Sequence, residues 1–197
     1  RFIEYLPKRT VGYGDWHSIG AQTPKDLILT VYSAYSVSLM IEIADALGKK
    51  EDAAKYRQLF EELKAEFQKK YVQDDGKIAG DTQTAYCMGL YYDLLTDKQR
   101  EQAAAHLVER LKVKEYHLSV GFLGAPILLP TLTEIGRNDL AYRLIQNKTY
   151  PSWGYSVEQG ATTIWERWNS YTKENGFKSP NMNSFNHYAY GACVEWM

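Results

Sequence analysis

Residues 23–48 read TPKDLILTVYSAYSVSLMIEIADALG, and this stretch predicts one long helix. Thr23 is placed to cap its N-terminus, Pro24 suits the first helical position, and Asp26 stands where a capping box has its acidic residue. Gly48 is a typical end signal. At about 1.5 Å per residue the helix is roughly 35 Å long. Because it is apolar on most sides, it belongs inside a helical protein.

The rest of the chain predicts helices that alternate between mostly apolar and amphipathic. No convincing run of alternating apolar and polar residues appears, so we expect little or no sheet. Such alternation is typical of the inner and outer layers of a helical barrel. After the first helix, the predicted helices cover Glu51–Tyr71, Thr82–Leu95, Thr96–Val113 (opened by a capping box of Thr96 and Gln99), Gly124–Gly136 (kinked at Pro130), Asn138–Asn147 and a last one from Asn183.

A faint internal repeat supports a barrel. The segments 47–51 and 135–139 are alike, and both read as turns from an inner to an outer helix. Their glycines, Gly48 and Gly136, are 88 positions apart, which is not a multiple of the roughly 34-residue tetratricopeptide period. Two hairpins of irregular length per interval fit a toroid better than a solenoid. The long loop predicted at Tyr150–Asn181 is where such a barrel carries function.

Length and charge narrow the class of protein. Residues 1–197 fit a single domain, and a net charge of -1 without a pooled basic surface argues against nucleic acid as a partner. No apolar run reads as long enough to span a membrane, so we expect no membrane partner. The two thiols, Cys87 and Cys193, each lie in an apolar run and are predicted to be buried and unpaired.

The ends of the chain predict a fragment. It begins at Arg1 and stops at Met197 within what reads as a helix, without a stop signal. No signal peptide is visible, which leaves the compartment open, with a periplasmic or secreted location favoured over a cytoplasmic one.

The last quarter of the chain is dense in aromatic residues. Four of the five tryptophans follow Pro151, and Glu166 lies between Trp165 and Trp168 in a segment that reads as loop. Aromatic faces with a few placed polar groups suit a sugar, whose C–H faces pack on indole and whose hydroxyls need hydrogen bonds. We therefore infer a carbohydrate-active site in which Glu166 transfers protons.

Several blocks of sequence carry a resemblance to a known family. They are Gly12-Tyr13-Gly14-Asp15-Trp16, the helix start at Thr23-Pro24, Asp81-Thr82-Gln83-Thr84-Ala85-Tyr86, Gly121-Phe122-Leu123-Gly124, Tyr150-Pro151-Ser152-Trp153-Gly154, Gly160 with Ala161-Thr162-Thr163-Ile164-Trp165-Glu166-Arg167-Trp168, and Ser184-Phe185-Asn186-His187-Tyr188-Ala189. In this order they resemble the catalytic domain of bacterial α-L-rhamnosidases of glycoside hydrolase family 78. The likeness covers essentially the whole chain, and the Ala-Thr-Thr-Ile-Trp-Glu-Arg-Trp and Asn-His-Tyr blocks are its most specific parts.

The resemblance implies an all-α fold and a function. The fold would be an (α/α)6 barrel, of which this chain holds a little over half, incomplete at its N-terminus and cut in its last helix. The family hydrolyses terminal α-L-rhamnose from glycans or plant glycosides with inversion. By likeness, Glu166 matches the general base, His187 a histidine lining the sugar subsite, and Trp16 a tryptophan that packs against the sugar ring.

The resemblance also has a gap. The family's general acid lies upstream of the Gly-Asp-Trp block, and nothing in this chain corresponds to it. We therefore expect the isolated chain to be inactive or nearly so. Inner helices without neighbours on one side would favour self-association.

Each candidate residue has a structural alternative. Glu166 would otherwise pair with Arg167 or another cation; as a base, its partial burial would raise its pKa toward a useful range. Trp16 would otherwise cover a barrel end. His187, expected in the second turn of the last helix, would otherwise be a core or rim residue.

Asp15 and Trp165 complete the candidate substrate-binding set. Asp15 either bonds a sugar hydroxyl or fixes its loop through nearby amides, and the structural role is favoured. Three weaker candidates are Asp81 as a helix cap, Glu158 as a solvated carboxylate, and His117 at the barrel mouth.

Motifs for other chemistries do not appear. No cluster has metal-ligand spacing and no glycine-rich loop reads as a phosphate site, so we expect neither metal nor cofactor. The expected partner is a rhamnose-containing carbohydrate. Two other functions stay open: a toroidal glycosidase for another sugar, and a non-catalytic helical-repeat scaffold that binds proteins.

Overall fold

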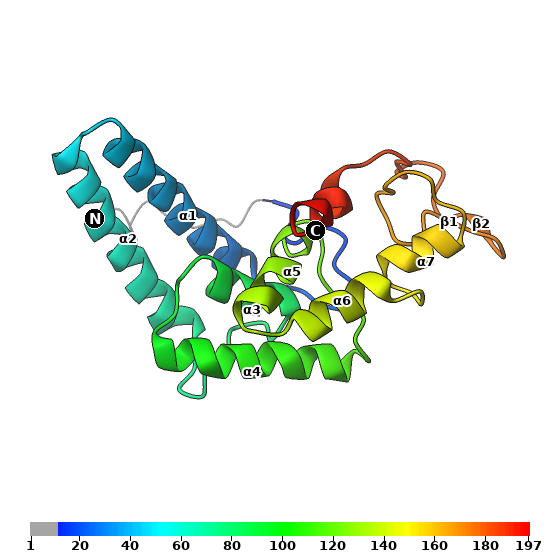
Figure 1. Ribbon diagram of the computed structural model, residues 1–197, viewed down its shortest axis with the longest axis horizontal. Coiled ribbons are helices and arrows are strands. Elements are labelled where there is room, and N and C mark those ends of the chain that lie inside the picture. Colours follow the sequence, from blue (N-terminus) through cyan, green and yellow to red (C-terminus); the bar gives the residue numbers. More distant parts are fainter. Residues whose placement is uncertain (1–11) are drawn as a thin grey trace.

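Three helical hairpins make up most of the computed structural model, which describes residues 12–197 (Figure 1). They are α1 (Lys25–Ala46) with α2 (Lys50–Tyr71), α3 (Gln83–Tyr91) with α4 (Asp97–Val113), and α5 (Ala125–Glu134) with α6 (Asn138–Gln146). A short helix α7 (Trp153–Glu158), an antiparallel ribbon of β1 (Tyr171–Thr172) and β2 (Gly176–Phe177), and the 3-10 helix η2 (Ala189–Glu195) follow. Residues 12–24, before α1, are irregular, and residues 1–11 lie outside the described part.

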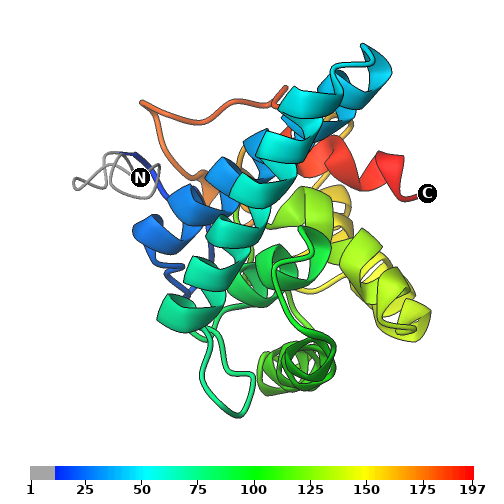
Figure 2. The same cartoon turned by 90° about the vertical axis from the view of Figure 1, so that its left-hand side faces the viewer.

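The helices form two layers. Helices α1, α3, α5 and η2 contact one another in chain order, while α2, α4 and α6 pack behind their own hairpin partners. Eight of the nine residues of α3 are buried, whereas α2 and α4 each bury one face. Figure 2 shows α4 end-on, next to the inner helix α3. The predicted all-α alternation of inner and outer helices is confirmed, and the described strands are two residues each.

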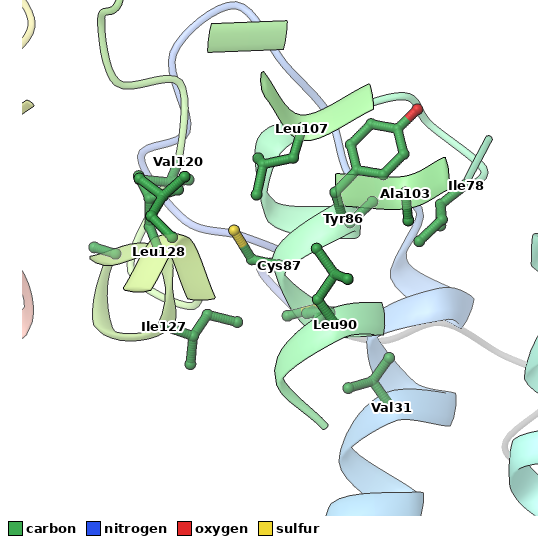
Figure 3. Packing of buried hydrophobic residues seen from close by; sticks show 14 of the residues in the cluster. Val31, Ile78, Tyr86, Cys87, Leu90, Ala103, Leu107, Val120, Ile127 and Leu128 are labelled. Atoms are coloured by element: carbon green, nitrogen blue, oxygen red, sulfur yellow. The ribbon is translucent and has the colours of Figure 1, made fainter. Parts of the chain in front are cut away.

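The core is centred on α3 (Figure 3). Leu90 of α3 lies on the side of Val31 of α1, Tyr86 points toward Ala103 and Leu107 of α4, and Cys87 points toward Leu128 of α5, all within one buried cluster. Both cysteines are buried and free, as predicted. This packing fixes the ends of the inner helices, from which the loops of the candidate site extend.

The inner-to-outer turns share one backbone geometry. At Gly48 and at Gly136 the chain has positive φ, and the next residue's amide bonds back to the carbonyl five positions earlier, as in a Schellman motif. The turn from α3 toward α4 has the same bonds with Asp93 in the left-handed position. The repeat therefore spans 45 residues from Gly48 to Asp93 and 43 from Asp93 to Gly136. The prediction of two hairpins between the glycines is confirmed.

Helix α1 differs from its prediction in two respects. It begins at Lys25, and Thr23 does not cap it, because the Thr23 hydroxyl bonds the Thr82 hydroxyl at 2.7 Å. By length and composition α1 could cross a membrane, contrary to the sequence interpretation. Its N-terminal half packs into the core, while Leu39, Met40, Ile43 and Leu47 toward its C-terminal end are exposed. A long apolar helix in the core of a helical barrel has the same length and composition as a membrane-spanning helix, so these two properties do not distinguish them.

Three other local predictions are wrong. The last helix does not begin at Asn183: residues 183–188 are irregular and η2 starts at Ala189. The segment 150–181 is not all loop, because it holds α7 and the β1–β2 ribbon. Asp81 does not cap α3; the Thr82 hydroxyl does, accepting the amide of Ala85 at 3.0 Å. The Thr96–Gln99 capping box is confirmed.

Candidate active site

Loops from four parts of the chain meet beside the inner helix ends. They are the segment 12–18 before α1, the turn 119–124 before α5, the loop 161–168 after α7, and the segment 184–190 that leads into η2. Backbone bonds join them in pairs: the Phe122 amide donates to the Trp16 carbonyl at 2.9 Å, and the His187 amide donates to the Ile164 carbonyl at 2.8 Å. Gly121 permits the first contact, since a Cβ there would lie 2.2 Å from the Trp16 carbonyl oxygen.

Asp15 fastens the first loop to the second. Its Oδ1 accepts the amides of Leu123 at 2.8 Å and Gly124 at 3.2 Å, and its Oδ2 accepts the Gly121 amide at 2.8 Å and the Thr84 hydroxyl. Burial raises the pKa of Asp15, and these four donors oppose that rise. Both oxygens of this buried side chain are occupied by protein donors, so its contacts fit the structural alternative and not sugar binding.

Glu166 is held by two neutral donors. Its Oε2 accepts the Ser184 amide at 2.9 Å, and its Oε1 lies 3.2 Å from His17 Nε2. The Glu166 amide in turn donates to the Ser184 carbonyl at 2.9 Å, which fixes the backbone on both sides. The carboxylate pairs with neither Arg167 nor another Lys or Arg in the described part of the chain, contrary to the structural alternative.

The direction of the Glu166 pKa was predicted wrongly. The Ser184 amide and the His17 ring lower its pKa more than burial raises it, although the residue is 7 % exposed. Glu166 is therefore ionised at neutral pH. A buried ionised carboxylate is ready to accept a proton, and it is not an acid waiting to donate one.

An aromatic layer lies around this pair. The rings of Trp16 and Phe122 lie 4.8 and 5.3 Å from the His17 ring, and the ring of Tyr190 lies 5.2 Å from that of Phe122. The Tyr190 hydroxyl donates to the His17 carbonyl at 3.2 Å. Trp168 stacks on Tyr190 with ring centroids 3.8 Å apart. These rings therefore form one connected aromatic cluster that packs against His17.

His187 joins the site from the segment before η2, not from a second helical turn. Its ring packs on Phe122 at 4.7 Å, and its Nδ1 accepts the Ala189 amide at 3.3 Å. In the neutral ring the proton therefore lies on Nε2, which makes no hydrogen bond within residues 12–197. This nitrogen is free to donate to a ligand hydroxyl.

The two candidate tryptophans lie in different surroundings. Trp16 is half-buried, with Tyr13 edge-on to its ring, and it borders a depression of about 650 Å³ lined by residues 13–18 and 22–25. Trp165 is buried, its ring edge-on to Phe185, and it lines a separate apolar cavity of about 300 Å³ with Trp153, Trp168 and Tyr190. Trp16 is thus partly exposed where it borders this depression, whereas Trp165 is buried.

The weaker candidates lie elsewhere. Asp81 accepts the Tyr86 hydroxyl at 2.6 Å and pairs with Arg110 at 3.2 Å. Glu158 pairs with Lys148 on the surface, and His117 bonds the Thr149 hydroxyl at 2.7 Å. None contacts Glu166. Over residues 12–197, no group of three or more His, Cys, Asp or Glu side chains is arranged to hold a metal ion.

Sequence reasoning missed His17, Phe122, Ser184 and Tyr190. His17 directly follows the Gly-Tyr-Gly-Asp-Trp block, and Phe122 and Ser184 lie inside blocks already noted, so their position in these blocks was an available signal. No single block showed that His17 contacts Glu166. His17 and Glu166 are 149 positions apart, and only the fold brings them together.

Known proteins match this chain over nearly its whole length. The model of the bacterial alpha-L-rhamnosidase 6 hairpin glycosidase domain matches residues 4–197. An alpha-L-rhamnosidase of Streptomyces avermitilis is 52 % identical over 100 % of this chain and 20 % of its own length. A crystal structure of the Streptomyces avermitilis enzyme complexed with L-rhamnose has a TM-score of 0.94 at 49 % identity, covering 100 % of this chain and 19 % of that one. An Aspergillus terreus α-L-rhamnosidase structure has a TM-score of 0.90 at 35 % identity, covering 97 % of this chain and 23 % of that one. The chain thus spans about a fifth of the length of these relatives.

Proposed function

Since the chain belongs to the family of bacterial α-L-rhamnosidase six-hairpin glycosidase domains, we propose that it forms part of the catalytic barrel of a longer α-L-rhamnosidase. We call the natural protein that contains this chain the full-length enzyme. Its substrates are rhamnose-containing glycans or glycosides. The exposed apolar end of α1 is expected to pack against another part of that enzyme or a second copy.

The geometry of Glu166 carries this proposal. It is an ionised carboxylate with two N–H donors, beside an aromatic site, and no Lys or Arg of residues 12–197 forms a hydrogen bond with it. We assign it the role of general base in an inverting hydrolysis. Glu166 takes a proton from a water while the water oxygen bonds to the anomeric carbon. The bond from that carbon to the leaving oxygen breaks, and a second carboxylic acid protonates the leaving group.

The general acid is assigned to a part of the enzyme outside the described residues. The resemblance places the family's general acid upstream of the Gly-Asp-Trp block that begins at Gly14. An inverting site needs its two carboxyl groups roughly 6.5–9.5 Å apart, to leave room for the water. Asp15 does not fit this role, because each of its oxygens already accepts two donors from the protein, whereas each oxygen of Glu166 accepts one.

Trp16 and His187 are proposed to bind the sugar. The partly exposed indole of Trp16, which borders the depression, suits the apolar C–H face and methyl group of rhamnose. His187 Nε2 is proposed to donate to a sugar hydroxyl.

A panel of aryl glycosides tests the substrate. The full-length enzyme is expected to hydrolyse aryl α-L-rhamnoside with kcat/KM about tenfold to a hundredfold above that for aryl α-L-mannoside, which differs only by the 6-hydroxyl group. An apolar site gains nothing from that hydroxyl and must remove it from water. Steady-state kinetics on both substrates measure the ratio.

Three outcomes separate the alternatives. Turnover of a different aryl glycoside, with none of rhamnoside, would keep the barrel and change the sugar. Inertness toward every glycoside, together with capture of a protein partner, would favour a binding scaffold. A rhamnoside preference supports the proposal.

A further inference from the structure

We propose that His17 is a positioning residue for the base: its neutral Nε2–H group holds Oε1 of Glu166 and keeps that carboxylate in a single orientation and ionised. This inference rests on the proposed role of Glu166. It assigns a function to a residue that the sequence interpretation passed over.

The direction of the hydrogen bond follows from the chemistry of the two partners. An ionised carboxylate can only accept, so at 3.2 Å the proton of the pair lies on His17 Nε2. Oε2 is held separately by the Ser184 amide at 2.9 Å. With one donor on each oxygen the carboxylate plane cannot rotate freely, and each oxygen keeps a lone pair for a water.

Backbone and ring contacts both hold His17 in place. Its backbone is left-handed, with φ of 62°, a conformation that few non-glycine residues adopt. Its ring lies between Trp16 and Phe122, and its carbonyl accepts the Tyr190 hydroxyl. A histidine held this tightly 149 positions from its partner loses little further freedom when it bonds Glu166.

The charge state of His17 also suits its role as a hydrogen-bond donor to Glu166. Burial lowers its pKa, as do Arg167 and His187, while Glu166 raises it. The ring is therefore neutral at neutral pH. A neutral imidazole donates one hydrogen bond to Glu166 and leaves the base to take its proton from water.

Two substitutions separate the hydrogen bond from the packing of the ring. His17→Phe keeps an aromatic ring between Trp16 and Phe122 but removes the N–H group. His17→Gln keeps an N–H group at a similar reach but removes the ring. Both place an ordinary L residue at the same positive φ, so the backbone strain is matched.

We expect His17→Phe to lower kcat of the full-length enzyme about tenfold to a hundredfold with little change in KM, as for one lost hydrogen bond to a charged group. Without that bond the Glu166 pKa rises. Because a base works only when deprotonated, the acidic limb of the kcat profile should then move to higher pH. His17→Gln should stay within a few-fold of the wild type and keep the wild-type limb.

Thermal unfolding of both variants checks that they fold. If His17→Phe is unfolded, His17→Asn replaces it, because Asn tolerates positive φ while its shorter side chain draws the donor away from Glu166. His17→Asn should show the same loss of kcat and the same shifted limb.

Either of two results would overturn the inference. The first is that His17→Phe or His17→Asn folds and keeps the wild-type kcat and the wild-type acidic limb. The second is that activity depends on the aromatic ring and not on the N–H group, so that His17→Gln is less active than His17→Phe. Glu166→Gln measured in parallel keeps the two proposals apart. If Glu166→Gln is inactive but His17→Phe is normal, the base stands and the role of His17 fails. If Glu166→Gln is fully active, the proposed role of Glu166 as the base fails, and the base lies elsewhere.

Discussion

Glu166→Gln is expected to lower kcat of the full-length enzyme by about 10²- to 10⁴-fold, the usual contribution of a general base. An amide cannot take the proton of the attacking water, while the aromatic surroundings of the sugar stay in place. KM should therefore change much less than kcat. Steady-state kinetics on aryl α-L-rhamnoside give both values.

Folding and specificity need controls in this experiment. Glutamine has one acceptor oxygen where both oxygens of Glu166 accept, so one hydrogen bond is lost and thermal unfolding must be recorded beside activity. Glu174→Gln is the matched control, because Glu174 is an exposed carboxylate in the turn between β1 and β2. It should retain wild-type activity. A folded Glu166→Gln enzyme within tenfold of wild type would place the base elsewhere.

Asp15→Ala is expected to cost about 3 kcal/mol of unfolding free energy or more, since each buried donor left without a partner costs about 1–3 kcal/mol. The substitution removes the acceptor of three backbone amides and one hydroxyl at once. It also releases the loop that carries Trp16 and His17 from the turn before α5. Urea unfolding measures the loss, and amide hydrogen exchange at Gly121 and Leu123 localises it.

The control for Asp15 is a carboxylate on the surface. Asp45 pairs with Arg57 where both side chains are about half exposed, so Asp45→Ala should cost less than about 1 kcal/mol. Equal effects of the two substitutions would show that Asp15 does not fasten the loop. Unchanged exchange at Gly121 would lead to the same conclusion.

Much of the fold could be predicted because the helices follow local rules. The capping box at Thr96 and the glycine at position 48 act within a few residues of the chain, and both are confirmed. The middle turn of the repeat escaped notice because Asp93 adopts the left-handed conformation there in place of a glycine. Thr23 was taken for a cap because its partner, Thr82, is distant in sequence.

Residues of the candidate site could be predicted from the sequence only where one short block contains the functional side chain and its neighbours. Glu166 and Trp16 were proposed as site residues from their own blocks, and these roles stay predictions. The pKa of Glu166 was predicted in the wrong direction because Ser184 and His17, which lower it, lie 18 and 149 positions away. The last helix was placed too early because the backbone amides of Ser184 and His187 bond Glu166 and Ile164 in place of helical carbonyls.

The stereochemistry of the first product tests most directly that Glu166 activates water. Proton NMR of aryl α-L-rhamnoside hydrolysis, recorded before the free sugar interconverts, shows which anomer the full-length enzyme releases. We expect β-L-rhamnose as the first product, because a water activated by Glu166 attacks the face opposite the leaving group. Release of α-L-rhamnose would contradict this expectation, since retention requires a carboxylate that bonds the sugar itself.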